Sequence, residues 1–191
     1  ESQAPDEPPQ EPATESIRQR QLSFFRTLPL ALERHDLRIV HACWQPEMIR
    51  SARQRCEAGQ LYHESAMRIR QACEARSDLD EVDVRLHLQN RNPVKTITSG
   101  PETRTALAQT IDGEQRFERR VRWWEDYDGI FCVFGHYSIR YRQPRGNSRS
   151  FCIDYGVGKR SQANRTTSMQ TSEWKLAAVR FPERTVIFDD G

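Results

Sequence analysis

Two histidines that follow apolar, strand-forming runs are the strongest candidates for chemistry in this sequence. His41 comes directly after the run RIV (38–40), and His136 follows the run IFCVFG (130–135). Side chains at strand ends can converge on one site while the scaffold stays rigid, and Gly135 lets the backbone turn sharply before His136. Neutral imidazole is the commonest metal-binding side chain. A single histidine after a strand is more often structural, but two in the same setting make a shared metal site an equal alternative.

Other chemistry-bearing patterns fail in their details. The segment GVGKRS (156–161) resembles a phosphate-binding loop, but such a loop needs Gly where Ile153 stands and Ser or Thr where Arg160 stands. The segment HAC (41–43) lacks the following Glu and the later P-C-x-x-C of a zinc deaminase. Asp154 lies inside an apolar run. It is therefore either a hydrogen-bonded structural residue or a residue that orients a site residue through a hydrogen bond.

The remaining histidines are predicted to be ordinary surface or packing residues. They are His35, in an expected turn, and His63 and His87, on expected helices. In these settings an imidazole faces solvent or packs on a helix, so none of the three is assigned a role.

The elements expected around these residues make an α/β or α+β domain in which helices cover one face of a sheet. A helix over 16–28 ends at Pro29, and a hairpin follows with strands in 28–33 and 37–44. Helices are expected over 46–58, 60–76 and 77–89, the last capped by Ser77, so 46–89 is a helical excursion between strands. Later strands are expected in 94–100, 119–124, 130–137, 150–156, 174–182 and 183–189.

The length and composition of the chain indicate a single polar domain. The 191 residues suit a single domain, and a hydrophobic content of 36% with no apolar run near 20 residues argues against a membrane protein. Residues 1–16 are rich in Pro and acids and are expected to be a disordered linker. Because the chain begins at Glu1 rather than at an initiator methionine, it is expected to be a fragment or to follow an upstream segment.

The charge and the cysteine content limit which partners and which cellular compartment fit this sequence. Lys occurs only at 95, 159 and 175, so 26 of the 29 basic residues are Arg; this suits phosphate binding, although a GC-rich genome has the same effect. The segment RFERRVR (116–122) beside Trp123 and Trp124 would suit a nucleic-acid binder, but the pI of about 8.4 is below that of a typical nucleic-acid-binding face. Five cysteines without a C-x-x-C pair favour reduced thiols in the cytoplasm.

Six segments, taken in order, carry a resemblance to a known family. They are LPLALERHDLRIVHACW (28–44), NPVKTITSGPE (92–102), RVRWW (120–124), VFGHY (133–137), FCIDYGVGKR (151–160) and LAAVRFPERTVIFDDG (176–191). Over residues 17–191 the chain resembles the C-terminal half of bacterial calcineurin-like metallophosphoesterases, which are related to serine/threonine protein phosphatases and diadenosine tetraphosphatases.

The resemblance implies a two-metal phosphoesterase built as a four-layer α/β/β/α sandwich. In that family the His of V-H-A and the His of G-H-Y bind the second metal, which gives His41 and His136 the role of metal ligands. The cofactors implied are divalent ions, Mn, Fe or Zn, and the substrate is a phosphoric ester such as a phosphoprotein or a dinucleoside polyphosphate.

The family's upstream motifs, G-D-x-H-G, G-D-x-x-D-R-G and G-N-H-E, are absent from the sequence. The chain alone is therefore expected to lack a complete metal site and to be inactive. The alternative is a catalytically inactive binding or scaffold module derived from the same fold. A half-domain should also expose apolar surface and a sheet edge, with Leu37, Ile39, Phe131 and Val133 as the expected contributors to self-association.

Overall fold

A five-stranded mixed sheet forms the centre of the structure, a computed structural model that describes residues 11–54, 57–111, 113–141, 143, 145–159 and 174–189. The strands stand in the order β1 (Ala31–Glu33), β2 (Arg38–Val40), β5 (Cys132–Phe134), β7 (Ser150–Cys152) and β6 (Gly146–Asn147). Strands β2, β5 and β7 are parallel, whereas β1 and β6 are antiparallel to their neighbours. The expected mixed α/β class is confirmed, and the three parallel strands end at the same edge of the sheet.

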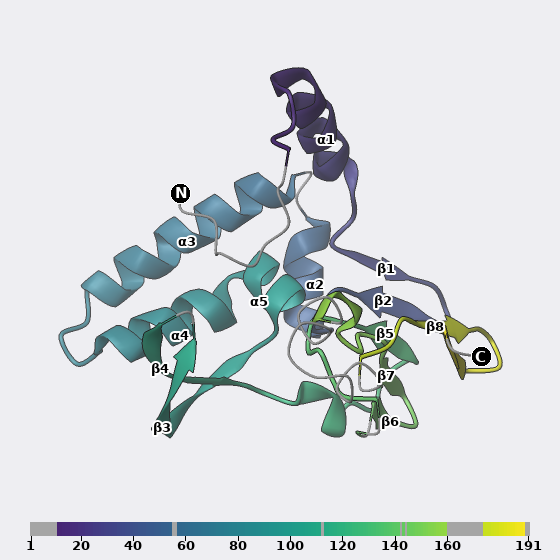
Figure 1. Cartoon of the computed structure of the whole chain (residues 1–191). Coiled ribbons are helices and arrows are strands. Elements are labelled where there is room, and N and C mark those ends of the chain that lie inside the picture. Colours follow the sequence, from purple (N-terminus) through teal and green to yellow (C-terminus); the bar gives the residue numbers. More distant parts are fainter. Residues whose placement is uncertain are drawn as a thin grey trace.

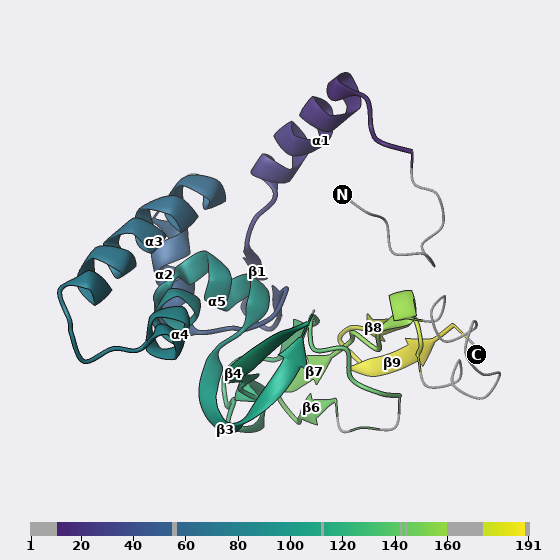
Figure 2. The same ribbon diagram turned by 60° about the vertical axis from the view of Figure 1, so that its left-hand side comes forward.

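Four helices between β2 and β5 gather beside one face of this sheet (Figures 1 and 2). They are α2 (Pro46–Arg53), α3 (Ala58–Glu74), α4 (Glu81–Arg91) and α5 (Pro93–Ser99). Ile49 of α2 and Ile97 of α5 join Val40, Trp124 and Phe134 of the sheet side in one buried apolar cluster. The helical excursion therefore extends to Ser99, ten residues beyond the expected boundary.

The segment 94–100, which was expected to be a strand, is the helix α5. Asn92 caps it, because its side-chain oxygen accepts hydrogen bonds from the backbone N–H groups of Val94 and Lys95. Pro93 occupies the first turn, and Gly100 ends the helix with a φ of 77°. These helix signals outweigh the strand preference of the β-branched residues between them.

Two further boundaries differ from expectation. The helix expected from Ser77 begins only at Glu81, because Asp80 and Asp83 form a reciprocal capping box. The strand expected over 119–124 ends at Arg120, and Trp123–Glu125 form a short 3-10 turn, η1. The turn directs Trp124 into the core, where 3% of its surface remains exposed.

A long hairpin that the sequence did not predict as a pair connects the helices to η1. Its strands are β3 (Glu102–Ile111) and β4 (Glu114–Arg120). The fully buried carboxylate of Glu118 accepts a hydrogen bond from Nε of Arg85, which ties β4 to α4. Removing the guanidinium would leave this buried carboxylate with only the longer contact to Arg116, at 3.7 Å, so the substitution should destabilise the fold.

The hairpin β8 (Ala177–Arg180) and β9 (Thr185–Phe188) closes the described chain and confirms two expected strands. Helix α1 (Glu15–Thr27) stands apart from the rest of the structure and has no buried residue (Figure 2). The expected linker 1–16 lies largely outside the described residues; residues 11–14 have no regular structure and α1 begins at Glu15. None of the described helices is both long and apolar enough to cross a membrane.

The second face of the sheet is only partly covered. Leu32, Ile39, Val133 and Phe151 are register neighbours across β1, β2, β5 and β7. Leu32 is 54% exposed and Ile39 is 40% exposed, whereas Val133 is buried. Phe131 is buried as well, because Phe181 stacks on its ring and the Arg184 guanidinium covers it. The expectation that Phe131 and Val133 contribute to an exposed seam is wrong, and exposure is confined to the β1 side.

Candidate functional site

His41 and His136 lie beside each other at the carboxyl edge of the sheet. His41 directly follows β2, and His136 follows β5 after one glycine. The backbone N–H of Gly135 donates to the carbonyl oxygen of His41 over 2.9 Å, so the two strand ends are held together. The imidazole centroids are 5.2 Å apart and the ring planes are inclined by 57°. The parallel pairing of β2 and β5 thus brings together two residues that are far apart in the sequence.

Asp154 holds the turn that presents His136. His136 and Ser138 have positive φ values of 71° and 45°, a conformation that needs support from its surroundings. One carboxylate oxygen of Asp154 accepts hydrogen bonds from the backbone N–H and the hydroxyl of Ser138, at 3.0 and 3.3 Å. The other accepts from the N–H of Gly156 at 2.9 Å. Asp154 is therefore a hydrogen-bonded structural residue, and the turn it supports carries a candidate ligand.

The surroundings of the His136 imidazole favour its neutral form. Its Nε2 is buried and has no hydrogen-bond partner among the described residues. Burial is the main cause that lowers the pKa of His136 to about 4, and the nearby charges of Arg120 and His41 lower it further, against a smaller opposing effect of Asp154. At neutral pH the imidazole is uncharged, and a neutral imidazole is the form that binds a metal ion.

The pair fits a divalent ion in chemistry and in spacing. An ion about 2.0–2.1 Å from one nitrogen of each ring, in tetrahedral geometry, would hold the ring centroids roughly 5 Å apart, close to the observed 5.2 Å. The buried Nε2 of His136 has no hydrogen-bond partner in the described part of the chain, which is expected of a nitrogen that binds a metal ion when the ion is absent. In the part of the chain that the structure describes, no group of three or more His, Cys, Asp or Glu side chains could hold a metal. The pair would therefore supply two ligands of a larger set.

Arg120, at the end of β4, places a positive charge beside the histidines. Its Nη1 donates to the carbonyl oxygen of His136 at 3.4 Å, and its guanidinium lies 5.9 Å from the ring centre of Tyr137. Arg116 and Arg122 pair with glutamates, whereas no ion pair within the described ranges involves Arg120. In the sequence this residue lies in an arginine-rich run and in the RVRWW segment, and neither pattern indicates a role for it.

The neighbouring tryptophans serve the core. Trp124 is buried against Phe134, and the indole N–H of Trp123 donates to the carbonyl oxygen of Ala42 at 2.9 Å. Both tryptophans therefore help to position the chain around His41.

The other three histidines have the surroundings expected of them. His35 is exposed in the β1–β2 turn, His63 is exposed on α3, and His87 is half-buried on α4. Their interpretation as surface or helix-packing residues is confirmed, and none of them lies with His41 and His136 in a shared site.

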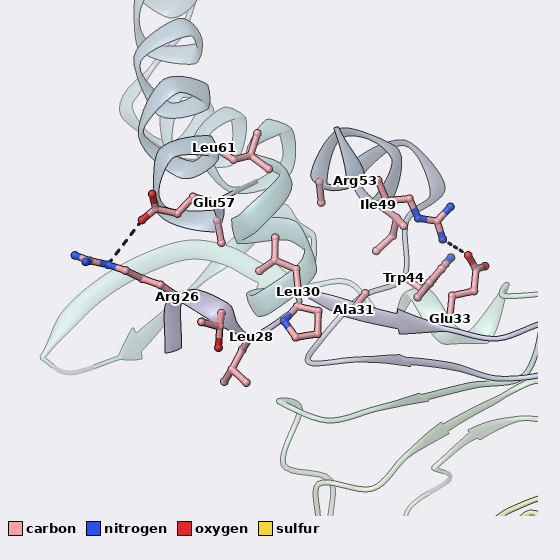
Figure 3. Close-up of a pocket in the computed structure, with 14 residues that line it drawn as sticks. Arg26, Leu28, Leu30, Ala31, Glu33, Trp44, Ile49, Arg53, Glu57 and Leu61 are labelled. Carbon is pink, nitrogen blue, oxygen red and sulfur yellow. Dashed lines mark hydrogen bonds and ion pairs between the residues drawn. The ribbon is translucent and has the colours of Figure 1, made fainter. Parts of the chain in front are cut away.

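A separate pocket of about 410 Å³ lies between the end of α1, strand β1 and helices α2 and α3 (Figure 3). Its apolar wall includes Leu30, Trp44 and Leu61. Its charged groups are paired with each other, Arg53 with Glu33 and Arg26 with Glu57. Neither His41 nor His136 lines this pocket, so it is separate from the histidine pair.

Comparisons of this chain with models of protein families, with curated proteins and with solved structures found no match. The functional interpretation consequently depends on the geometry of the histidine pair and on the sequence segments that surround it.

A pH dependence follows from the lowered pKa of His136. The pKa of about 4 in the folded chain is below the ordinary value of 6.5, so the unfolded chain binds more protons between these pH values. Without metal, the stability should therefore fall as the pH drops from about 6.5 toward 4. Urea unfolding in EDTA measures the free energy of unfolding at pH 7.5 and at pH 5. The decrease in this free energy at pH 5 should be smaller for His136→Gln than for the wild type. An equal decrease in both proteins would show that His136 does not cause the pH dependence.

Proposed function

We propose that this chain is the C-terminal part of a two-metal phosphoesterase in which His41 and His136 bind one divalent ion. The observation that carries the proposal is the convergence of the two imidazoles, with Nε2 of His136 buried and without a partner among the described residues. The proposal also uses the resemblance of the segments around both histidines to metallophosphoesterases. Its substrates would be phosphoric esters of the phosphoprotein or dinucleoside polyphosphate class.

When bound, two divalent ions such as Mn, Fe or Zn would supply an activated water and neutralise charge on the phosphoryl group. This chain's own contribution is the orientation of the ligands. The β2 and β5 strand ends fix the two rings, and Asp154 holds the turn of His136. The guanidinium of Arg120 adds positive charge on the same side, which favours an anionic substrate. The sheet with helices on one face would be part of a four-layer sandwich.

The alternative function is a catalytically inactive binding module derived from the same fold. The observation in its favour is that the described residues offer no third ligand beside the two histidines. A cytoplasmic location is part of either proposal, and the four free thiols within the described ranges support it.

A contrast between two proteins tests the proposed function. The chain alone should show no metal-dependent hydrolysis of p-nitrophenyl phosphate above buffer, because water activation needs two ions held a few ångströms apart. The same chain joined to an upstream half that carries G-D-x-H-G, G-D-x-x-D-R-G and G-N-H-E should hydrolyse the ester with manganese. An inactive but folded and metal-loaded joined protein would favour the binding module instead.

The isolated chain is also expected to self-associate through the β1 side of the sheet. Leu32 and Ile39 are exposed register neighbours, and β1 is an edge strand. Sedimentation velocity should show dimers or larger species, and the double substitution Leu32→Lys/Ile39→Lys should shift them toward monomer. Leu107→Lys on the β3–β4 hairpin, where Leu107 is 79% exposed, is the matched control. A wild-type chain that is monomeric at high concentration would overturn this expectation.

A further inference from the structure

Arg120 lies beside the histidine pair and has no partner of opposite charge within the described part of the chain. Its side chain is exposed at the end of β4, and its Nη1 donates to the carbonyl oxygen of His136 at 3.4 Å. Its charge also reaches the imidazole, because after burial it is the next largest cause that lowers the pKa of His136. His41 is exposed as well, so this edge of the sheet is open to a ligand.

The acidic groups nearest to Arg120 are engaged elsewhere. Glu118 lies two residues earlier, on the same face of β4. Its buried carboxylate accepts a hydrogen bond from Arg85 and lies 3.7 Å from Arg116. The carboxylate of Asp154 accepts hydrogen bonds from backbone N–H groups. The positive charge of Arg120 is therefore available to a ligand.

A guanidinium in this position opposes the binding of a cation unless an anion binds with it. A divalent ion between His41 and His136 would be repelled by Arg120, because like charges repel. An anion that contacts both the ion and the guanidinium changes this repulsion into attraction. Guanidinium groups match phosphoryl oxygens in charge and geometry, through two parallel N–H donors. An arginine without an ion pair beside two candidate metal ligands thus favours a phosphoryl group as the third component of the site.

We propose that Arg120 binds the phosphoryl group of the substrate and makes the site selective for phosphomonoesters. This inference rests on the proposed function, since it needs a divalent ion at the histidine pair. The guanidinium would donate to two non-bridging oxygens of the phosphoryl group. A phosphomonoester has a third such oxygen that can face the histidine pair, whereas a phosphodiester has none left. Phosphoproteins are monoesters, so they fit this site better than dinucleoside polyphosphates do.

Calorimetric titrations of the whole chain test the proposal. The chain is titrated with zinc, and the zinc-loaded chain is then titrated with methyl phosphate or with dimethyl phosphate. Methyl phosphate should bind at least about tenfold more tightly than dimethyl phosphate, and Arg120→Gln should weaken its binding by about tenfold or more, the usual loss for a hydrogen bond between charged groups. Arg120→Lys should recover only part of the affinity, because lysine lacks the planar fork.

The zinc titration distinguishes substrate binding from a structural role of Arg120. Arg120→Gln should leave the zinc affinity unchanged or raise it, because the substitution removes a positive charge. A structural role in the His136 turn would instead lower the affinities for zinc and for methyl phosphate together. Arg119→Gln is the matched control, because Arg119 is an exposed neighbour whose side chain projects from the other face of β4. It should bind both probes like the wild type.

The results that would overturn the proposal also show which step is wrong. If the chain does not bind zinc, the proposed function fails and the assignment of Arg120 fails with it. If zinc binds but methyl phosphate binds equally well to the wild type and to Arg120→Gln, only the assignment of Arg120 is wrong. The same conclusion follows if dimethyl phosphate binds as tightly as methyl phosphate, or if Arg120→Gln lowers the zinc affinity.

Discussion

Replacement of His41 or His136 by alanine in the joined, complete phosphoesterase is expected to abolish most metal-dependent turnover. Each substitution removes one of the two imidazoles whose centroids lie 5.2 Å apart. Under the proposed function these imidazoles would hold an ion that would supply an activated water and neutralise charge on the phosphoryl oxygens. Loss of a single electrostatic contributor in a reacting site typically lowers the rate by about 10²–10³-fold, and loss of a metal should be at least as large. Initial rates with p-nitrophenyl phosphate and saturating manganese measure the effect.

The matched control for this experiment is His63→Ala. His63 is exposed on α3, and its nearest described ring partner is Tyr62, so its loss should leave turnover unchanged. Equal losses from all three substitutions would indicate general destabilisation, which thermal melts of the three variants would reveal. Full activity of the His136→Ala protein would show that His136 is not a ligand.

Removal of the Asp154 carboxylate is expected to weaken metal binding without removing a ligand. Asp154→Ala eliminates the acceptor for Ser138 and Gly156, and therefore the support for the positive φ of His136. Residues that orient a metal-binding side chain through hydrogen bonds commonly contribute about 10–100-fold to the metal affinity. Titration of the chain with Zn²⁺ should show a loss of this order for Asp154→Ala.

Two further variants distinguish positioning from a general loss of stability. Asp154→Asn keeps one acceptor oxygen and should recover part of the affinity. Asp128→Ala changes an exposed carboxylate outside the turn and should leave zinc binding unchanged. Unchanged zinc affinity in a folded Asp154→Ala protein would show that the turn holds its shape without the carboxylate.

The sequence was sufficient to predict the strand ends and their histidines. Continuous apolar runs before His41 and His136 are typical of buried parallel strands, and Gly135 indicated the sharp turn between β5 and His136. The pairing itself could not be predicted, since about 90 residues of helix and hairpin separate the two strands along the chain. The hydrogen bond between Gly135 and His41 is a product of the tertiary fold.

The errors at α5 and η1 have physical causes that the sequence contains only in part. The run VKTIT has the residue types of a strand, yet Asn92, Pro93 and Gly100 provide a cap, a first turn and an end. Burial of Trp124 against Phe134 ends β4 at Arg120, which no local pattern indicates. Arg120 was consequently missed, because its position beside His136 depends on where that strand ends and on the ion pair that ties β4 to α4.

The central claim, that His41 and His136 bind one ion, is tested most directly by a crystal of the chain soaked in zinc and measured at the zinc absorption edge. If both histidines bind the ion, an anomalous peak is expected between the two rings, about 2.0–2.1 Å from Nε2 of His136 and from one nitrogen of His41. The peak should be absent from the His136→Ala crystal. A wild-type crystal with no peak between the rings, or with zinc bound to only one of the two histidines, would contradict it.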